Sequence, residues 1–205
     1  MMLDEKVQLF RENKENLLII SDFDFTITNY RDEFGNNAPN SINVYRRGNL
    51  MPEGYSEESE KIAEKYLPYI HDIEIPEDEK YEAMDNWWKE HFEVIKKYKF
   101  PKDIYDKIAK DNIITLRNDF DKFTKIVHSN NIPFLIFSAG IREMIIKVLE
   151  YNLSYEKEIH VIANMFKYDS EDNFIGLEGD LIHSMSKGRV DLSKYSFYDD
   201  IKSKK

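Results

Sequence analysis

Two carboxylates one residue apart, Asp22 and Asp24, follow a short apolar run at residues 17–20. The run is too short for a helix and ends in two β-branched residues, which favours a buried strand. Ligand sites of α/β proteins lie at the carboxyl ends of such strands. The two acids could share one polar cavity only if the backbone bends or a cation lies between them, and a hard divalent ion such as Mg²⁺ would serve. A solvated turn is the alternative, but Phe23 and Phe25 interleave the acids with apolar groups that such a turn does not need.

A second apolar run, residues 132–140, ends in the small residues Ser138, Ala139 and Gly140. A helical pattern follows at residues 141–151. The amino terminus of a helix presents free backbone N–H groups, so the end of this strand is a candidate anion site. A tight turn between strand and helix is the commoner role of such small residues.

A lysine, Lys187, enters after a third strand pattern and completes a set that could hold and attack a phosphoryl group. We expect Asp22 to be the nucleophile, and Asp24 to protonate the leaving oxygen and later to activate water. Ser138 and the amides of the two residues after it would bind phosphoryl oxygens, while Lys187 would neutralise charge in the transition state. An isolated lysine is usually solvated, so the order and strand-end placement of the whole set make the pattern specific.

The composition narrows the class of protein that must position these groups. The chain has 205 residues, of which 41% are hydrophobic and 14% aromatic, enough for one core with an insertion. Lys and Arg number 29 against 39 Asp and Glu, and the net charge of −10 argues against binding to nucleic acid or to anionic membranes. The absence of Cys excludes disulfides, thiolate catalysis and Cys-based zinc sites. No signal peptide or membrane span is evident, so we expect a soluble, cytoplasmic protein whose oligomeric state the sequence does not address.

The elements that would carry the site follow an interrupted α/β pattern. Periodicity is lost over residues 29–56, where Asn, Gly and Pro collect, as in a loop that crosses between subdomains. Helical spacing is found on both sides of this loop, at residues 3–13, from residue 56 to prolines 68 and 76, and at 77–98, 101–111 and 114–130. A third strand is expected at 159–163, a hairpin at 165–182 and a last helix from 186 to 205. A block of helices is therefore predicted to interrupt the α/β pattern after the first strand.

The strings around these candidates resemble a known superfamily. They are Asp22-Phe23-Asp24-Phe25-Thr26, Phe137-Ser138-Ala139-Gly140-Ile141, Asn164, and Gly179-Asp180-Leu181-Ile182-His183 with Lys187. As a set they resemble the first three motifs of haloacid-dehalogenase-like phosphatases and, more narrowly, the cytosolic pyrimidine 5′-nucleotidases. The resemblance implies an α/β fold with a Rossmann-like parallel sheet, formed by residues 1–28 and 116–205, and a helical cap at 29–115. It also implies nucleoside 5′-monophosphates as substrates, Mg²⁺ held by Asp22 and Asp24, and an aspartyl-phosphate intermediate.

The cap carries one match to this family and one departure from it. Trp87 and Trp88 resemble part of the family helix that borders the nucleobase, although the pair could equally be ordinary cap core. Where the family places a Glu that reads the base, this chain has Ile70, and His71 or Asp72 could replace it only if the register slips. The loss of that acceptor puts a preference for pyrimidines in question.

The fourth motif of the superfamily, an acidic Gly-Asp-x-x-x-Asp after another strand, is absent from the sequence. Asp199 and Asp200 lie within a predicted helix and follow no apolar strand. We therefore expect the chain to stop before the fourth strand, which leaves the core incomplete. Two functions are compatible with this pattern. One is a Mg²⁺-dependent 5′-nucleotidase, and the other is a non-catalytic, truncated phosphatase-like protein that binds phosphorylated ligands or a partner.

Overall fold

A computed structural model of the chain describes residues 3–47, 50–101, 103–154 and 159–202. Its centre is a four-stranded sheet in the order β1-β2-β3-β4. The strands are β1 (Ile19–Ser21), β2 (Phe134–Ile141), β3 (Ile159–Tyr168) and β4 (Phe174–Glu178). The first three are parallel and β4 is antiparallel to β3. The α/β class predicted from the sequence is thus confirmed.

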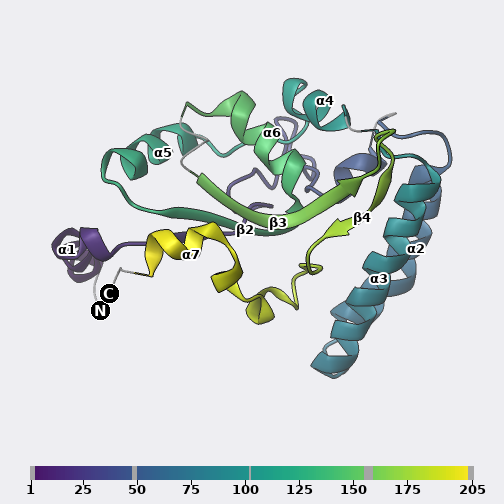
Figure 1. Ribbon diagram of the computed structural model, residues 1–205, viewed down its shortest axis with the longest axis horizontal. Coiled ribbons are helices and arrows are strands. Elements are labelled where there is room, and N and C mark those ends of the chain that lie inside the picture. The colour runs from purple at the N-terminus through teal and green to yellow at the C-terminus, as the bar shows by residue number, and fades with distance from the viewer. Residues whose placement is uncertain (1–2, 48–49, 102, 155–158, 203–205) are drawn as a thin grey trace.

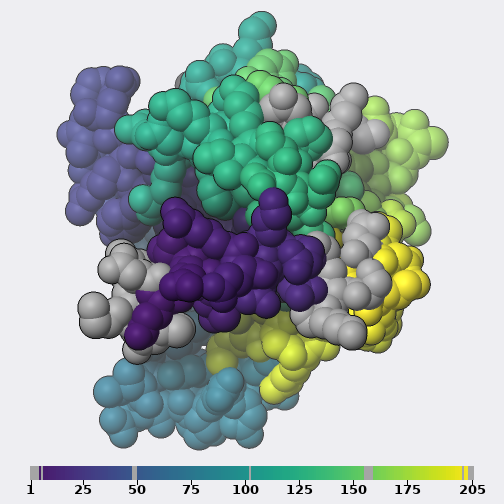
Figure 2. Space-filling view, turned by 90° about the vertical axis from the view of Figure 1, so that its left-hand side faces the viewer, coloured from purple at the N-terminus to yellow at the C-terminus, as the bar shows by residue number. Residues whose placement is uncertain are grey.

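Helices cover both faces of this sheet and extend beyond one end of it (Figure 1). They are α1 (Leu3–Glu12), α2 (Tyr55–His71), α3 (Glu77–Lys97), α4 (Ile104–Lys110), α5 (Phe120–Ser129), α6 (Arg142–Asn152) and α7 (Ser196–Ile201). In Figure 1, α4, α5 and α6 lie on one side of the sheet and α7 on the other, with α2 and α3 at the end opposite to α1. Figure 2 looks onto the α1 end, where that helix, in purple, lies at the surface. Its apolar residue Phe10 is 55% exposed.

Strand β2 is buried on both faces, which explains its unbroken apolar run. Phe134 and Ile136 belong to the large core cluster that also contains the buried face of α6. Leu135 points the other way and packs with Ile162 and Phe197 in a second cluster beneath α7. Because side chains alternate along a strand, only a strand covered on both sides needs apolar residues at every position. The site at the end of β2 is therefore held by a strand fixed from two directions.

The long helices α2 and α3 pack against each other and stand at the carboxyl ends of the parallel strands. Phe92 of α3 contacts Phe166 of β3 and Phe174 of β4, with ring centroids 6.0 and 5.7 Å apart. Helix α4, by contrast, packs against α6. The division into a core of residues 1–28 and 116–205 and a cap of residues 29–115 stays a prediction.

Three expected helices differ from those in the structure. Helix α2 continues through Pro68 to His71, since packing against α3 offsets the hydrogen bond that the proline cannot donate. The helix expected from residue 114 begins at Phe120, because Asp119 before it is left-handed, with φ of 64°. The last segment is broken into 3₁₀ turns at Lys187–Arg189 and Leu192–Lys194 before α7, and residues 203–205, into which a helix was expected to run, lie outside the described residues. Among the residues described, the helices are all too short or too polar to cross a membrane.

Candidate active site

The backbone turns sharply directly after β1, as a shared cavity for the two acids requires. The carbonyl oxygen of Phe23 accepts hydrogen bonds from the amides of Thr26, Ile27 and Thr28 at 3.3, 3.0 and 3.1 Å. Phe25 within this turn is left-handed, with φ of 61°. This conformation is costly for a bulky residue and persists only where the surrounding contacts impose it. The backbone therefore bends between the two acids, which is one of the two conditions under which they could share a cavity.

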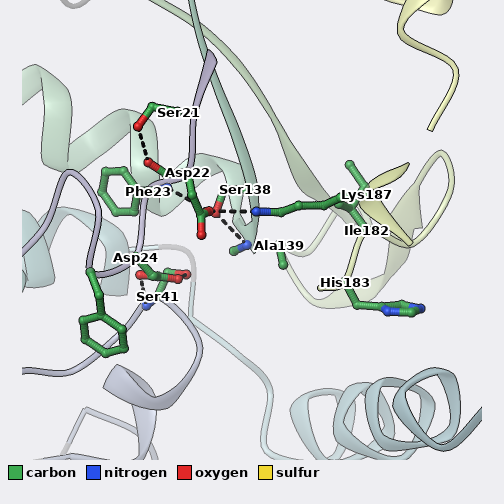
Figure 3. Close-up of polar contacts among 12 residues, drawn as sticks. Ser21, Asp22, Phe23, Asp24, Ser41, Ser138, Ala139, Ile182, His183 and Lys187 are labelled. Carbon is green, nitrogen blue, oxygen red and sulfur yellow. Dashed lines mark hydrogen bonds and ion pairs between the residues drawn. The ribbon is translucent and has the colours of Figure 1, made fainter. Parts of the chain in front are cut away.

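Asp22 and Lys187, far apart in the sequence, meet at the centre of the site (Figure 3). The lysine Nζ lies 2.8 Å from Asp22 Oδ1, which also accepts the amide of Phe23 at 2.9 Å. Both of these hydrogen bonds end on Oδ1, so among the described residues Oδ2 keeps its lone pairs for another partner. The side chain of Asp22 is 46% exposed and that of Lys187 is 24% exposed. This ion pair therefore contributes little to stability and stays accessible from solvent.

Asp24 is held by a residue that sequence reasoning missed. Ser41 donates its backbone N–H to Asp24 Oδ1 at 2.8 Å and its hydroxyl to Oδ2 at 2.5 Å. Burial raises the pKa of Asp24 to about 6, and the negative charge of Asp22 adds to this rise, while the two bonds from Ser41 oppose it. Ser41 lies in the aperiodic stretch after the first motif, where a single serine carries no local signal.

Gly140 allows Ser41 to come close to the end of β2. A Cβ atom on Gly140 would lie 2.2 Å from Ser41 Oγ and 3.1 Å from Ser138 Oγ. The Gly140 amide donates to Ser138 Oγ at 3.0 Å, and Ser138 is fully buried. The structure therefore brings Ser138, Ala139 and Gly140 to the same end of the sheet as Asp22 and Asp24.

Asn164 ties the end of β2 to the loop that carries Lys187. Its buried side-chain amide donates to the carbonyl oxygens of Ala139 and Ile182 at 2.8 and 2.7 Å. Its Oδ1 accepts the amide of Ile182 at 2.8 Å. Three of the four hydrogen-bonding positions of the amide group are thus satisfied by backbone groups, which fixes the spacing between the two segments.

Trp87 and Trp88 lie on the buried face of α3, 6% and 2% exposed. Trp87 stacks on His91, with ring centroids 5.3 Å apart, and Trp88 packs against Phe92 at 5.2 Å. The Nε1 atom of Trp87 is buried and makes no hydrogen bond within the described part of the chain. Ile70, at the position where a base-reading acid was sought, is also buried. The assignment of both tryptophans to a nucleobase stays a prediction.

The donor atoms at the end of β1 are oxygen atoms, the type of ligand that Mg²⁺ prefers. Mg²⁺ prefers oxygen atoms and is commonly held by one or two carboxylates together with water and substrate phosphate. Asp22 offers such a carboxylate, with Oδ2 not engaged. Over the described ranges, however, no group of three or more His, Cys, Asp or Glu side chains could hold a metal ion. Asp199 lies on α7, where it pairs with Lys202 at 2.7 Å.

Comparisons with known proteins identify the family of the chain. The profile of the family described as pyrimidine 5′-nucleotidase (UMPH-1) matches residues 25–205. The 7-methylguanosine phosphate-specific 5′-nucleotidase of Drosophila melanogaster is 30% identical over 188 residues, which cover 91% of this chain and 58% of that protein. The human protein of the same name is 26% identical, over 93% of this chain and 63% of its own length. The chain thus spans about three fifths of the length of these curated relatives.

Solved structures show the same relationship. The crystal structure of cytosolic 5′-nucleotidase IIIB bound to cytidine is 26% identical, with a TM-score of 0.78 over 95% of this chain and 65% of that one. A probable phosphoserine phosphatase from Vibrio cholerae, 14% identical with a TM-score of 0.54 over 89% of this chain and 46% of that one, shares the fold. The family predicted from the motifs is confirmed: the chain belongs to the pyrimidine 5′-nucleotidase (UMPH-1) family.

Proposed function

We propose that this chain hydrolyses nucleoside 5′-monophosphates, with Asp22 as the nucleophile. The observation that carries the proposal is the 2.8 Å contact between Asp22 and Lys187. A carboxylate held beside a cation, with one oxygen not engaged, has the arrangement needed to attack a phosphorus atom while the lysine offsets the charge that develops. Membership of a 5′-nucleotidase family supports the same reaction.

The reaction would proceed in two balanced steps. In the first, Asp22 Oδ2 forms a bond to phosphorus, the bond from phosphorus to the 5′-oxygen breaks, and Asp24 gives its proton to that oxygen. In the second, water attacks the phosphorus of the aspartyl phosphate, Asp24 takes up a proton from that water, and the bond to Asp22 breaks to release orthophosphate. The buried position of Asp24 suits it to hold a proton before the first step.

The remaining groups would bind the phosphate. Ser138 and the amides of Ala139 and Gly140 at the end of β2 would contact phosphoryl oxygens, and Lys187 would neutralise their charge. The carboxylate of Asp22 and the main-chain carbonyl of Asp24 would hold Mg²⁺. When bound, that ion supplies positive charge next to the phosphoryl oxygens.

We infer the substrate class from the names of the relatives and not from a pocket in this structure. Curated relatives are named for 7-methylguanosine phosphate, and a structural relative is bound to cytidine. A nucleoside is common to both, so we assign nucleoside 5′-monophosphates as the class and no single base. Trp87 and Trp88 on α3 would border the base.

The test is orthophosphate release by the 205-residue chain from a panel of nucleoside 5′-monophosphates with Mg²⁺. Asp22→Asn should leave less than about a hundredth of the rate, because a covalent nucleophile has been removed. If the variant keeps more, Asp22 is not the nucleophile.

The alternative is a phosphate-binding protein without turnover, and one observation favours it. Within the described residues no three His, Cys, Asp or Glu side chains converge, so few protein side chains would hold a metal ion beside Asp22. Binding of inorganic phosphate that depends on Lys187, without release of phosphate from any nucleotide in the panel, would establish this alternative.

A further inference from the structure

A second set of contacts links the Lys187 loop to the long helix α3. His183 from this loop lies against Asp85 and Tyr81 of α3, and Arg189 covers the Tyr81 ring. Figure 3 shows Lys187 extending from the loop toward Asp22, while the His183 ring points away from that carboxylate. None of these four residues belongs to the site described above. They join α3 to the loop that carries Lys187.

The main chain of His183 builds the turn that presents Lys187. Its carbonyl oxygen accepts the amides of Ser186 and Lys187 at 3.0 and 3.2 Å. Its own amide donates to Ser186 Oγ at 2.8 Å. The backbone of Lys187 is therefore hydrogen-bonded directly to that of His183 within one turn.

The imidazole ring of His183 has a defined tautomer. The Met185 amide donates to Nδ1 at 3.2 Å, so Nδ1 carries a lone pair and the neutral ring has its proton on Nε2. Burial lowers the pKa of His183, the charge of Arg189 adds to this, and Asp85 opposes it. The ring is 1% exposed and its Nε2 lies 3.3 Å from Asp85 Oδ1.

This Nε2 donor is incompletely satisfied. Within the described part of the chain it makes no hydrogen bond of good geometry, although the Asp85 carboxylate is near. A buried donor without an aligned acceptor costs free energy, so a small movement of α3 that aligned Asp85 would be favoured. The Asp85 carboxylate is thus the group of α3 that faces this buried donor.

Aromatic packing adds a second contact between α3 and the Lys187 loop. Tyr81 and Asp85 are four residues apart and so share one face of α3. The Tyr81 ring meets His183 edge-on at 4.8 Å, and the guanidinium of Arg189 lies 4.1 Å from its centroid. Tyr81 therefore contacts residues on both sides of Lys187 in the sequence, so α3 packs directly against this turn.

We propose that His183 is a positioning residue that couples α3 to the placement of Lys187 against Asp22. The expected consequence is that Lys187 takes its place beside Asp22 when α3 approaches the core. Only this consequence rests on the proposed function. The coupling itself is a property of the folded chain. It can be measured without turnover.

The experiment measures acetylation of lysines in the full chain by mass spectrometry. Lys187 is the reporter, and Lys122 of α5, which pairs with Asp119 at 2.6 Å on the surface, is the internal standard. Asp85→Ala should raise the acetylation rate of Lys187 about fivefold relative to Lys122, because it removes the carboxylate that faces the buried His183 Nε2 at 3.3 Å. Asp85→Asn keeps an acceptor oxygen and should have a smaller effect. Glu93→Ala removes an exposed acid from the same helix, paired only with Lys96 among the described residues, and should have none.

The coupling would be overturned if His183→Gln changed the acetylation of Lys187 but Asp85→Ala did not. His183 would then stabilise the loop without its contact to α3. The double variant provides a second check. If Asp85 acts through His183, the combined effect should equal that of His183→Gln alone, whereas independent effects would multiply. His183→Gln could fail to fold, and Asp85→Ala, at a partly exposed side chain, then decides the matter by itself. Absence of nucleotidase activity would contradict the proposed function and leave this result standing.

Discussion

Ser41 donates hydrogen bonds to both carboxylate oxygens of Asp24, one from its backbone N–H and one from its hydroxyl. The two bonds fix the plane of the carboxylate, because each oxygen has its own donor. Ser41 is fully buried and lies against Gly140 at the end of β2. The proposed acid and base is therefore oriented by a residue of the loop between β1 and α2, and that loop is oriented by β2.

Ser41→Ala should lower kcat about tenfold with little change in KM. The variant loses the hydroxyl bond but keeps the amide bond, so Asp24 would be free to rotate without leaving the site. Steady-state kinetics with a nucleoside monophosphate and with a small aryl phosphate would measure this. Ser56→Ala, which removes an exposed hydroxyl bonded to the Arg46 carbonyl, is the matched control. A rise in KM with unchanged kcat would assign Ser41 to substrate binding instead.

Gly140→Ala should destabilise the chain by about 1–3 kcal/mol, because the added methyl group would overlap Ser41 Oγ. Gly188→Ala is the control for stability, since a Cβ there meets nothing within 4 Å. Urea unfolding would compare the two variants. Adding Ser41→Gly to Gly140→Ala should recover stability, and failure to recover it would show that the clash lies elsewhere.

Trp87→Phe tests whether this residue borders the nucleobase. If it does, KM should rise for nucleoside monophosphates more than for a small aryl phosphate, because base stacking on an aromatic residue is worth about 1–3 kcal/mol and the larger indole is lost. Trp87 is also packed on His91 in the interior of the helical pair. Equal losses for the two substrates would show that the tryptophan acts in packing alone.

Acid should destabilise the helical pair through His91. Burial lowers the pKa of this histidine from 6.5 to about 3, and the charge of Arg46 adds to the shift. The unfolded chain therefore binds the proton more readily, so the contribution to stability is complete above about pH 6.5 and is lost as the pH falls toward 3. Between pH 7 and pH 5 the wild type should lose about 2 kcal/mol more than His91→Gln.

Urea unfolding of both proteins at the two pH values would check this. Every other titrating group, Asp24 among them, is common to both chains and cancels in the comparison. Equal losses of stability in the two proteins would mean that His91 is not a buried neutral group.

The positions of Asp22 and Ser138 could be predicted from the sequence for a simple physical reason. An apolar run followed by polar or small residues marks a strand end, and parallel strands bring their carboxyl ends to one edge of the sheet. The strong apolar character of β2, buried on both faces, made its end especially clear. The helices α3 and α6 were also predictable, since their apolar residues recur at helical spacing.

The tertiary structure alone decided which distant groups complete the site. Ser41 reaches Asp24 from a stretch without periodicity, and His183 meets Asp85 only because α3 stands at the ends of the strands. The final segment breaks into short turns, although its local pattern had suggested one helix. Patterns of apolar residues report which face of an element is buried, but not which neighbour covers it. That choice depends on the packing of whole elements, which no short string of residues encodes.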